Sequence, residues 1–204
     1  MSATFPVLLD GYTDLPPGKI ANVVTFLEMT EPPATVTAPA GFAVAVARRP
    51  DPAAFLALYR RIGETWLWTS RAAMPPAELA ALLALPTTEM LTLEKDGAAI
   101  GLVELDYSVP GDVEIVTFGV VPEAMGTGAA QIMMGGTLAR IFGGGAARVW
   151  LHTCTFDHPR ALGFYRRNGF RPYKFAIEVS DDPRRTGHLP VTAGPHVPLI
   201  GNRP

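Results

Sequence analysis

The stretch VVPEAMGTGAA at residues 120–130 joins an apolar segment to a glycine-rich turn and to the start of a helical pattern. The apolar segment, 113–121, has the length and composition of a buried strand. After the turn, apolar residues recur at helical spacing at Ala130, Met134, Leu138 and Ile141. Backbone N–H groups at such a helix start, unobstructed by side chains, bind anions with the help of the helix dipole. We therefore expect an anion site in this turn.

The two common nucleotide-binding motifs do not fit the turn. A P-loop requires a lysine directly after its last glycine, and here Ala129 follows Gly128. A dinucleotide-binding fingerprint requires a third glycine, where this chain has Gln131. It also requires an acidic residue about 20 positions later, where the chain reads Ala-Ala-Arg. The residues therefore argue against a nucleotide-binding regulatory protein, a class that binding of ATP or NAD would support.

The segments around the turn alternate between strand and helix patterns. Helices are predicted at 55–66, after the proline pair at 75–76, after Gly128, and from His158 to a left-handed C′ glycine at Gly169. Strands are predicted at 42–47, 89–94, 98–106, 113–121, 148–153 and 170–179, with Asp96-Gly97 as a hairpin turn. The order β-α-α-β-β-β-α-β-α-β indicates an α/β layered domain.

Prolines concentrate at the two ends of the chain. Of 20 prolines, six lie in residues 1–40 and five in 181–204. We therefore expect an extended N-terminal arm at 1–40, a compact domain at 41–180 and a proline-rich C-terminal tail at 181–204. The two ends could close a binding site, mediate a homodimer, or do both.

Charge and cysteine content argue against several classes of protein. The chain has 17 Lys and Arg against 19 Asp and Glu, a net charge of −2, which is not the charge balance of a nucleic-acid binder. The single cysteine, Cys154, excludes an internal disulfide framework. No basic region precedes Lys19, and no apolar run approaches the ~20 residues of a membrane span. We expect a cytoplasmic protein without nucleic-acid or membrane partners.

Two motifs within this order of elements resemble the GCN5-related N-acetyltransferase (GNAT) superfamily. The family's signature R-G-x-G-x-[G/A] is matched by Gly126, Gly128 and Ala130, with Met125 at the arginine position. Its motif N-x-x-A-x-x-F-Y-x-x-x-G-F is matched by HPRALGFYRRNGF at 158–170, except that His158 replaces the asparagine. The likeness covers roughly residues 41–180. It implies a mixed, mostly antiparallel central sheet flanked by helices.

The resemblance also implies acetyl-coenzyme A as donor and a primary amine as acceptor. In the family, amides of the glycine-rich turn hold the pyrophosphate, and the preceding strand pairs its backbone with the pantetheine arm. Carried onto this sequence, the cofactor contacts are Phe118, Gly119, Val120, Val121, Met125, Gly126, Thr127, Gly128, Ala129, Ala130, His158, Ala161 and Tyr165. Because Met125 lacks a side-chain donor for phosphate, we expect weaker cofactor binding than in members with arginine there.

Glu114 and Tyr165 are the candidate catalytic residues. Glu114 is the only charged residue within 113–121, and burial in such a strand raises the pKa of a carboxyl toward that of a useful general base. The alternative places Glu114 at the outer end of the strand, paired with an arginine. Tyr165 aligns with family tyrosines that face the cofactor sulfur, so it is the candidate acid for the leaving thiolate. The alternative is a core aromatic beside Phe164 and Phe170.

Trp66 and Trp68 are weaker candidates for the acceptor pocket. Trp66 continues the apolar stripe of the first predicted helix, which favours a core position. Trp68 would lie ~200° away around that helix if the helix persists, so it is the better pocket residue.

A metal site is the less favoured interpretation of His152, Cys154 and His158. Their spacing is mixed, and no carboxylate completes a zinc ligand set. A nucleophilic pair of Cys154 and His158 is equally weak, because a free cysteine is usually a small core residue. We therefore expect no metal.

The sequence thus favours an acetyl-coenzyme A-dependent N-acetyltransferase. A small-molecule amine would attack the thioester directly in a ternary complex, with Glu114 as base and Tyr165 as acid. Two alternatives stay open. The departures at Met125 and His158 are compatible with a non-catalytic acyl-coenzyme A-binding regulatory module, and the unspecified acceptor is compatible with a protein or peptide N-acetyltransferase.

Overall fold

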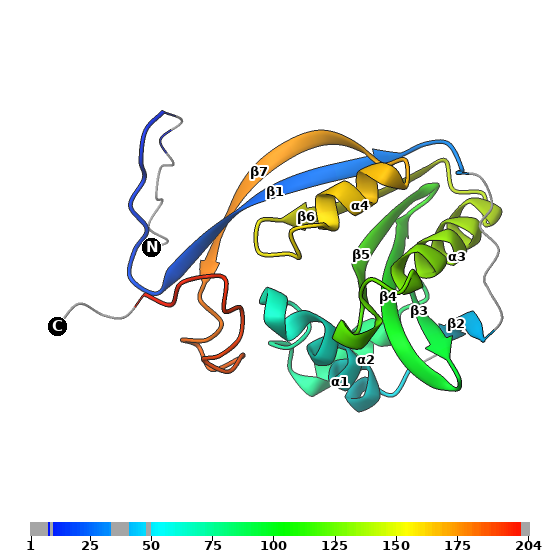
Figure 1. The fold of residues 1–204 in the computed structure, drawn as a ribbon, viewed down its shortest axis with the longest axis horizontal. Coiled ribbons are helices and arrows are strands. Elements are labelled where there is room, and N and C mark those ends of the chain that lie inside the picture. Colours follow the sequence, from blue (N-terminus) through cyan, green and yellow to red (C-terminus); the bar gives the residue numbers. More distant parts are fainter. Residues whose placement is uncertain (1–7, 9, 34–40, 48–49, 201–204) are drawn as a thin grey trace.

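A seven-stranded sheet with the strand order β2-β3-β4-β5-β6-β1-β7 organises the chain (Figure 1). The computed structural model describes residues 8, 10–33, 41–47 and 50–200. The strands are β1 (Lys19–Met29), β2 (Phe42–Ala47), β3 (Thr88–Lys95), β4 (Ala98–Val109), β5 (Asp112–Val120), β6 (Arg148–Cys154) and β7 (Arg171–Asp181). Among these strands β5 and β6 pair in parallel, and the other neighbours pair antiparallel. The expected mixed, mostly antiparallel sheet is confirmed.

Helices cover both faces of the sheet. They are α1 (Pro52–Gly63), α2 (Pro76–Leu83), α3 (Ala129–Gly143) and α4 (Ala161–Arg167). A Cβ at Gly119 of β5 would contact Ile62 of α1, whereas a Cβ at Gly101 of β4 would contact Met133 of α3. Gly101 pairs with Val120, the neighbour of Gly119, and neighbouring strand residues face opposite sides, so α1 and α3 lie on opposite faces. No helix in the described residues is long and apolar enough to cross a membrane.

The hairpin between β3 and β4 has the turn that its sequence predicts. Asp96 and Gly97 both have positive φ, 51° and 80°. Lys95 pairs with Ala98 across this two-residue turn. Left-handed backbone at both central positions is the geometry for which Asp-Gly is preferred.

Strands β5 and β6 separate after a short stretch of parallel pairing. Their register ends where Ile115 lies opposite Leu151. A β-bulge at Val116 follows, because Glu104 of β4 pairs with Thr117 while its neighbour Leu105 pairs with Ile115. From there to Val120, β5 pairs with β4 alone, so its other edge faces an opening in the sheet.

Strand β1 is the main difference from the expected fold. Residues 1–40 are predicted to form an extended arm, yet Lys19–Met29 pairs with β6 on one side and with β7 on the other. The sequence KIANVVTFLEM lacks a clean alternation of apolar and polar residues, and it lies between the proline pairs at 16–17 and 32–33. These prolines bound the strand, because a residue without an N–H ends a hydrogen-bonded ladder. From residue 42 onward the predicted order of elements is confirmed.

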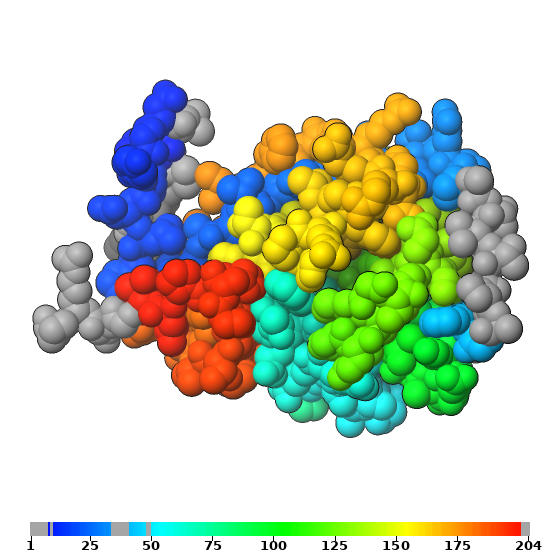
Figure 2. Space-filling model, viewed as in Figure 1, coloured from blue at the N-terminus to red at the C-terminus, as the bar shows by residue number. Residues whose placement is uncertain are grey.

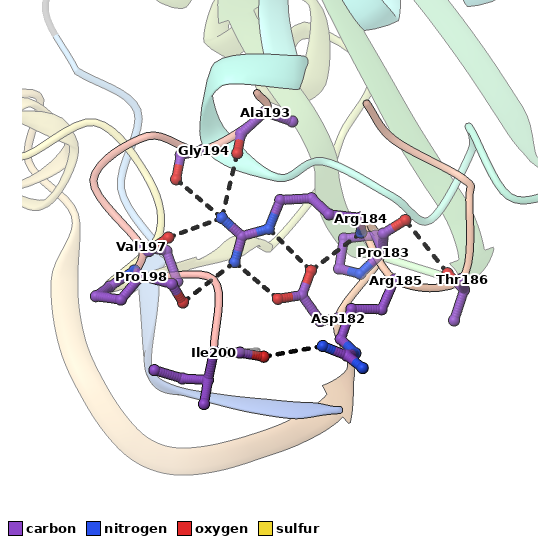
Figure 3. A network of polar contacts seen from close by, with 10 residues as sticks. All are labelled: Asp182, Pro183, Arg184, Arg185, Thr186, Ala193, Gly194, Val197, Pro198 and Ile200. Atoms are coloured by element: carbon purple, nitrogen blue, oxygen red, sulfur yellow. Dashed lines mark hydrogen bonds and ion pairs between the residues drawn. The ribbon is translucent and has the colours of Figure 1, made fainter. Parts of the chain in front are cut away.

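The C-terminal segment that follows β7 is organised around Arg184. This side chain is only 6% exposed and forms an ion pair with Asp182. Its guanidinium also donates hydrogen bonds to four backbone carbonyls, those of Ala193, Gly194, Val197 and Pro198 (Figure 3). A guanidinium charge buried so deeply is stabilised because its N–H groups bond to the Asp182 carboxylate and to backbone carbonyls. The proline-rich tail therefore has an ordered loop held by one arginine.

This C-terminal loop packs against the chain that follows α1. A Cβ at Gly194 would lie 2.5 Å from Cγ of Leu67, and Gly194 has a φ of +54°, so a side chain fits poorly there. His196 Nε2 forms a hydrogen bond with the carbonyl of Phe156, at 2.9 Å. Figure 2 shows the loop, in red, lying against both the cyan segment after α1 and the yellow segment after β6.

Replacing Arg184 with Met should reduce the free energy of unfolding by about 3–5 kcal/mol, because Asp182 would stay buried without its partner. The hydrogen bonds from Arg184 lower the pKa of Asp182. This contribution is therefore present at neutral pH and is lost as the pH falls through that lowered pKa. Denaturant unfolding at neutral and at acidic pH measures both effects.

The double variant Asp182→Asn, Arg184→Met should recover part of the loss, since it removes the lone buried charge. Arg166→Met, on the exposed surface of α4, is the matched control. Equal losses in Arg184→Met and Arg166→Met would contradict the role of the buried pair.

Candidate active site

An open cavity of about 720 Å³ lies where β5 and β6 separate. Residues 115–120 of β5 and the side chains of His152 and Cys154 on β6 line it from two sides. Most of the residues predicted from the sequence lie in its wall: Trp66, Trp68, Phe118, Gly119, Val120, Met125, Gly126, Gly128, Ala130, His158, Ala161 and Tyr165. Four others do not reach the wall: Glu114, Val121, Thr127 and Ala129.

The glycine-rich turn has the backbone geometry of an anion cradle. Gly126 and Gly128 have φ of 77° and 88°, a conformation that glycine adopts without steric cost. A Cβ at either position would meet no atom within 4 Å, so the space beside the turn is open. The N–H groups of Gly126, Gly128 and Ala130 donate to none of the described residues. They are therefore available to a ligand.

The charges around this turn also favour an anion. Gly128 is the N-cap of α3, no side chain caps that helix, and its first turn holds no acidic residue. The hydroxyl of Thr127 donates to the carbonyl of Ala124 at 2.7 Å and accepts from the Ala129 N–H at 3.4 Å, so it is bound within the turn itself. Arg160 and Arg167 line the same cavity. A helix N-terminus in a cavity that also holds two guanidinium groups suits phosphate.

The free edge of β5 supplies a second set of backbone groups. Phe118, Gly119 and Val120 line the cavity, beyond the last residue that pairs with β6. Val121 differs from the expectation: its N–H donates to the carbonyl of Ile100 at 2.9 Å, and its side chain is buried. It lies just past the end of β5, where the chain turns into the short helix η2 (Pro122–Ala124).

Glu114 is half-buried on β5, close to the cavity but behind its wall. Burial raises the pKa of its carboxyl to about 7, and the negative charge of Asp106 adds to this effect. Its Oε1 lies 3.8 Å from Nδ1 of His152, and His152 lines the cavity. The nearby Arg71 is bound to Glu104 instead. The alternative of a simple pairing of Glu114 with arginine is therefore not what the structure has.

Tyr165 combines the two roles that the sequence left open. Its ring packs edge-on against Phe118, Phe164 and Phe170, as a core aromatic would. The same residue lines the cavity, and its hydroxyl has no hydrogen-bond partner among the described residues. Burial raises the pKa of the hydroxyl well above its ordinary value, so Tyr165 stays protonated at neutral pH.

Both tryptophans line the cavity, although a core position was favoured for Trp66. The α-helix ends at Gly63, a 3₁₀ turn covers Glu64–Trp66, and Leu67 has a left-handed φ of 59°. Trp68 packs against the core and donates its Nε1–H to Asp157 at 3.2 Å. Trp66 instead lies between two imidazoles, those of His158 and His196. Both side chains are half-buried, and the left-handed turn at Leu67 separates them because the helix does not persist.

His152, Cys154 and His158 have separate interactions in the structure and do not form a common site. Burial raises the pKa of the Cys154 thiol to about 11, which leaves little thiolate for a nucleophilic role. His158 Nδ1 accepts a hydrogen bond from the Arg160 N–H at the start of α4. No group of three or more His, Cys, Asp or Glu side chains within the described residues is arranged to hold a metal ion.

Asn22 and Glu178 are cavity residues that the sequence did not reveal. They come from β1 and β7 and lie opposite each other in the register. Since 156 positions separate them in the chain, no local pattern connects them. Prediction of β1 as a strand would have been the only route to this pair.

Solved structures share the fold. Over 79% of this chain and 52% of that one, a GCN5-related N-acetyltransferase from Sphaerobacter thermophilus superposes with a TM-score of 0.57 at 16% identity. One from Kribbella flavida gives 0.56 at 19% identity, over 80% of this chain and 60% of that one. At such identities the likeness concerns the fold alone.

Sequence comparison identifies the family. The model of the Acetyltransferase (GNAT) family matches residues 39–170. The chain is 36% identical over 95 residues to an uncharacterized N-acetyltransferase of Mycobacterium bovis, a match that covers 47% of this chain and 60% of that relative. The protein belongs to the GNAT family of acetyltransferases.

Glu114 should titrate with a pKa of about 7, and Asp106→Asn should lower that pKa by removing the strongest of the negative charges that raise it. NMR of labelled glutamate carboxyls measures both values, with Glu94→Gln as a remote control. Because the pKa is raised in the folded state, ionisation of Glu114 lowers the free energy of unfolding as the pH rises from 4.5 to about 7. Glu114→Gln should remove this slope. A pKa near 4.5 would contradict the burial argument.

Proposed function

We propose that this protein is an acetyl-coenzyme A-dependent N-acetyltransferase that acts on the amine of a small molecule. One observation carries the proposal: the free backbone edge of β5 and the unoccupied N–H groups of the glycine-rich turn border the same cavity. An extended ligand with an amide-containing arm and a pyrophosphate needs these two features, in this order. Family membership supports the same assignment.

The residues of the cavity fit such a donor. Gly126, Gly128 and Ala130 would bind the pyrophosphate through their N–H groups, with Arg160 and Arg167 near the phosphates. The edge of β5 at 118–120 would hydrogen-bond to the pantetheine arm. Met125 adds no donor, so the phosphate contacts rest on the backbone and on these arginines. When bound, acetyl-coenzyme A supplies an acetyl group activated as a thioester.

At neutral pH the acceptor amine is an ammonium, which must lose one proton to solvent before it can attack, and the attacking nitrogen gives up a second proton as the C–N bond forms. Glu114 is the base that accepts this proton. His152, which lines the cavity and contacts the Glu114 carboxylate, relays the proton from the substrate. A pKa of about 7 leaves Glu114 partly ionised at neutral pH, where it can both accept the proton and release it to solvent. This refines the role expected from the sequence, because Glu114 itself lies behind the wall.

Tyr165 is the acid that donates a proton to the leaving thiolate. Its hydroxyl is protonated at neutral pH and free of other partners in the described residues, so it can donate to the developing negative charge. The thiolate gains one proton as the amine loses one, which balances the transfer. The ring contacts with Phe118, Phe164 and Phe170 hold the hydroxyl in place.

The shape of the acceptor end favours a small molecule over a protein. Trp66 and the residues of β1 and β7 line this end, and the C-terminal loop packs beside it (Figure 1). His196 of that loop contacts Trp66. These elements leave less access for a folded protein than an open sheet would.

Calorimetric titration should show micromolar binding of acetyl-coenzyme A and no binding of ATP or NAD. Gly128→Ala should weaken this binding at least tenfold, since it places a methyl group in the cradle at a left-handed position that costs about 1–2 kcal/mol. Gly111→Ala has the same backbone cost, at a φ of 76°, in a turn between β4 and β5, so it is the control. Thiol release with a panel of amines then tests turnover. Binding without release from any amine would favour the non-catalytic acyl-coenzyme A-binding module.

Tyr165→Phe should lower kcat by ~10²–10⁴-fold, the range of acid–base contributions, with little change in the affinity for acetyl-coenzyme A. Steady-state thiol release and calorimetry separate the two quantities. Tyr12→Phe, at an exposed position, is the control. Unchanged kcat in Tyr165→Phe would remove this hydroxyl from the mechanism.

A further inference from the structure

A buried amide oxygen in the cavity wall lacks a hydrogen-bond partner. Asn22 on β1 is 5% exposed, and its Oδ1 is the buried side-chain atom without a partner among the described residues. Its Nδ2 donates to Oε2 of Glu178 at 2.9 Å. An unsatisfied buried acceptor costs about 1–3 kcal/mol, so the fold retains Asn22 at a loss in stability. A ligand that donates to Oδ1 would recover this loss.

Asn22 and Glu178 lie at the end of the cavity away from the glycine-rich turn. They are directly opposite each other in the register of β1 and β7, and Ser180 also lines the cavity. Figure 1 shows the start of β1 and the end of β7 side by side. The glycine-rich turn lies at the N-terminus of α3, at the other end. His152 of β6 and Tyr165 of α4 line the same cavity. A group bound at Asn22 is therefore a second group of the acceptor.

The charge at this end selects a cation. Three carboxylates line the cavity: Asp157, Glu178 and Asp181. Asp157 accepts hydrogen bonds from Trp68, Thr153 and the Cys154 N–H, and Asp181 is paired with Lys19 at 2.7 Å. Glu178 has no cationic partner among the described residues. The wall also holds Arg160 and Arg167, at the start of α4 and within it, and two imidazoles: His152 lies 3.8 Å from Glu114, and His158 packs against Trp66.

We propose that Glu178 and Asn22 form a subsite for a second cationic group of the acceptor, so that the substrate is a diamine. One amine is acetylated beside His152 and Tyr165, and the other binds the carboxylate of Glu178 and the Oδ1 of Asn22. An ammonium group has three donors, so one group can satisfy both acceptors. The role of the subsite in catalysis rests on the proposed function. Binding of an ammonium group by Glu178 and Asn22 does not depend on that function.

The test compares α,ω-diamines of increasing chain length with the monoamines of the same length, by thiol release from acetyl-coenzyme A. We expect kcat/KM to be higher for a diamine of matching length. Glu178 is exposed, so Glu178→Gln should lower kcat/KM for that diamine by about two- to fivefold, the value of an ion pair at an exposed carboxylate, and leave the monoamine nearly unchanged. Glu78→Gln, at an exposed position on α2, is the matched control. Equal kcat/KM for each matched pair, or equal effects of the two glutamate variants, would overturn the subsite.

A second variant guards against misfolding. Asn22→Leu removes the orphan oxygen, so the free protein should unfold at the same or a higher temperature, while the preference for diamines is lost. A binding measurement separates the subsite from the reaction: the diamine alone should raise the melting temperature of the wild type and not that of Glu178→Gln. If no amine releases thiol, the proposed function fails, and this thermal shift still decides the subsite. The absence of the shift in the wild type would overturn it.

Discussion

The early end of the parallel pairing between β5 and β6 is the constraint on which the site depends. Backbone N–H and C=O groups in a protein interior need partners, and a sheet normally provides them on both sides of a strand. Beyond Ile115, β5 has a partner on one side only, and the bulge at Val116 marks the change. The polar edge that remains must bond to water or to a ligand. The cavity therefore forms where the β5–β6 ladder ends. β5 is still paired with β4 there, and β6 is still paired with β1.

The same strand connects the gap to the anion cradle. Val120 ends β5, and the glycine-rich turn begins a few residues later, so the two features are placed by continuous chain and not by a flexible loop. The cavity wall also holds charges of both signs: those of Arg160 and Arg167, at the start of α4 and within it, and that of Glu178 on β7.

Features encoded by neighbouring residues could be predicted from the sequence, and features set by distant contacts could not. The glycine-rich turn and the segment 158–170 are local motifs, and both lie where their residues imply. Trp66 and Trp68 both line the cavity, but the helix from which their relative positions were predicted ends at Gly63, and the left-handed Leu67 packs against Gly194, far along the chain. Glu114 was found by its charge within an apolar strand, but the position of His152 in front of it depends on the register of β5 and β6. Strand β1 was missed because it is stabilised by strands more than a hundred residues away.

The place of β1 in the sheet also determines when the site can form. This strand is made early in synthesis but lies between β6 and β7, and Asn22 meets Glu178 across 156 positions. Contacts at such separation slow folding, because the entropy of loop closure is lost before the contact stabilises it. The half of the sheet from β2 to β5 can pair as soon as it is made, since its neighbours are consecutive in the chain. The anion cradle can thus assemble while the acceptor end is still missing, and the two halves of the cavity mature in sequence.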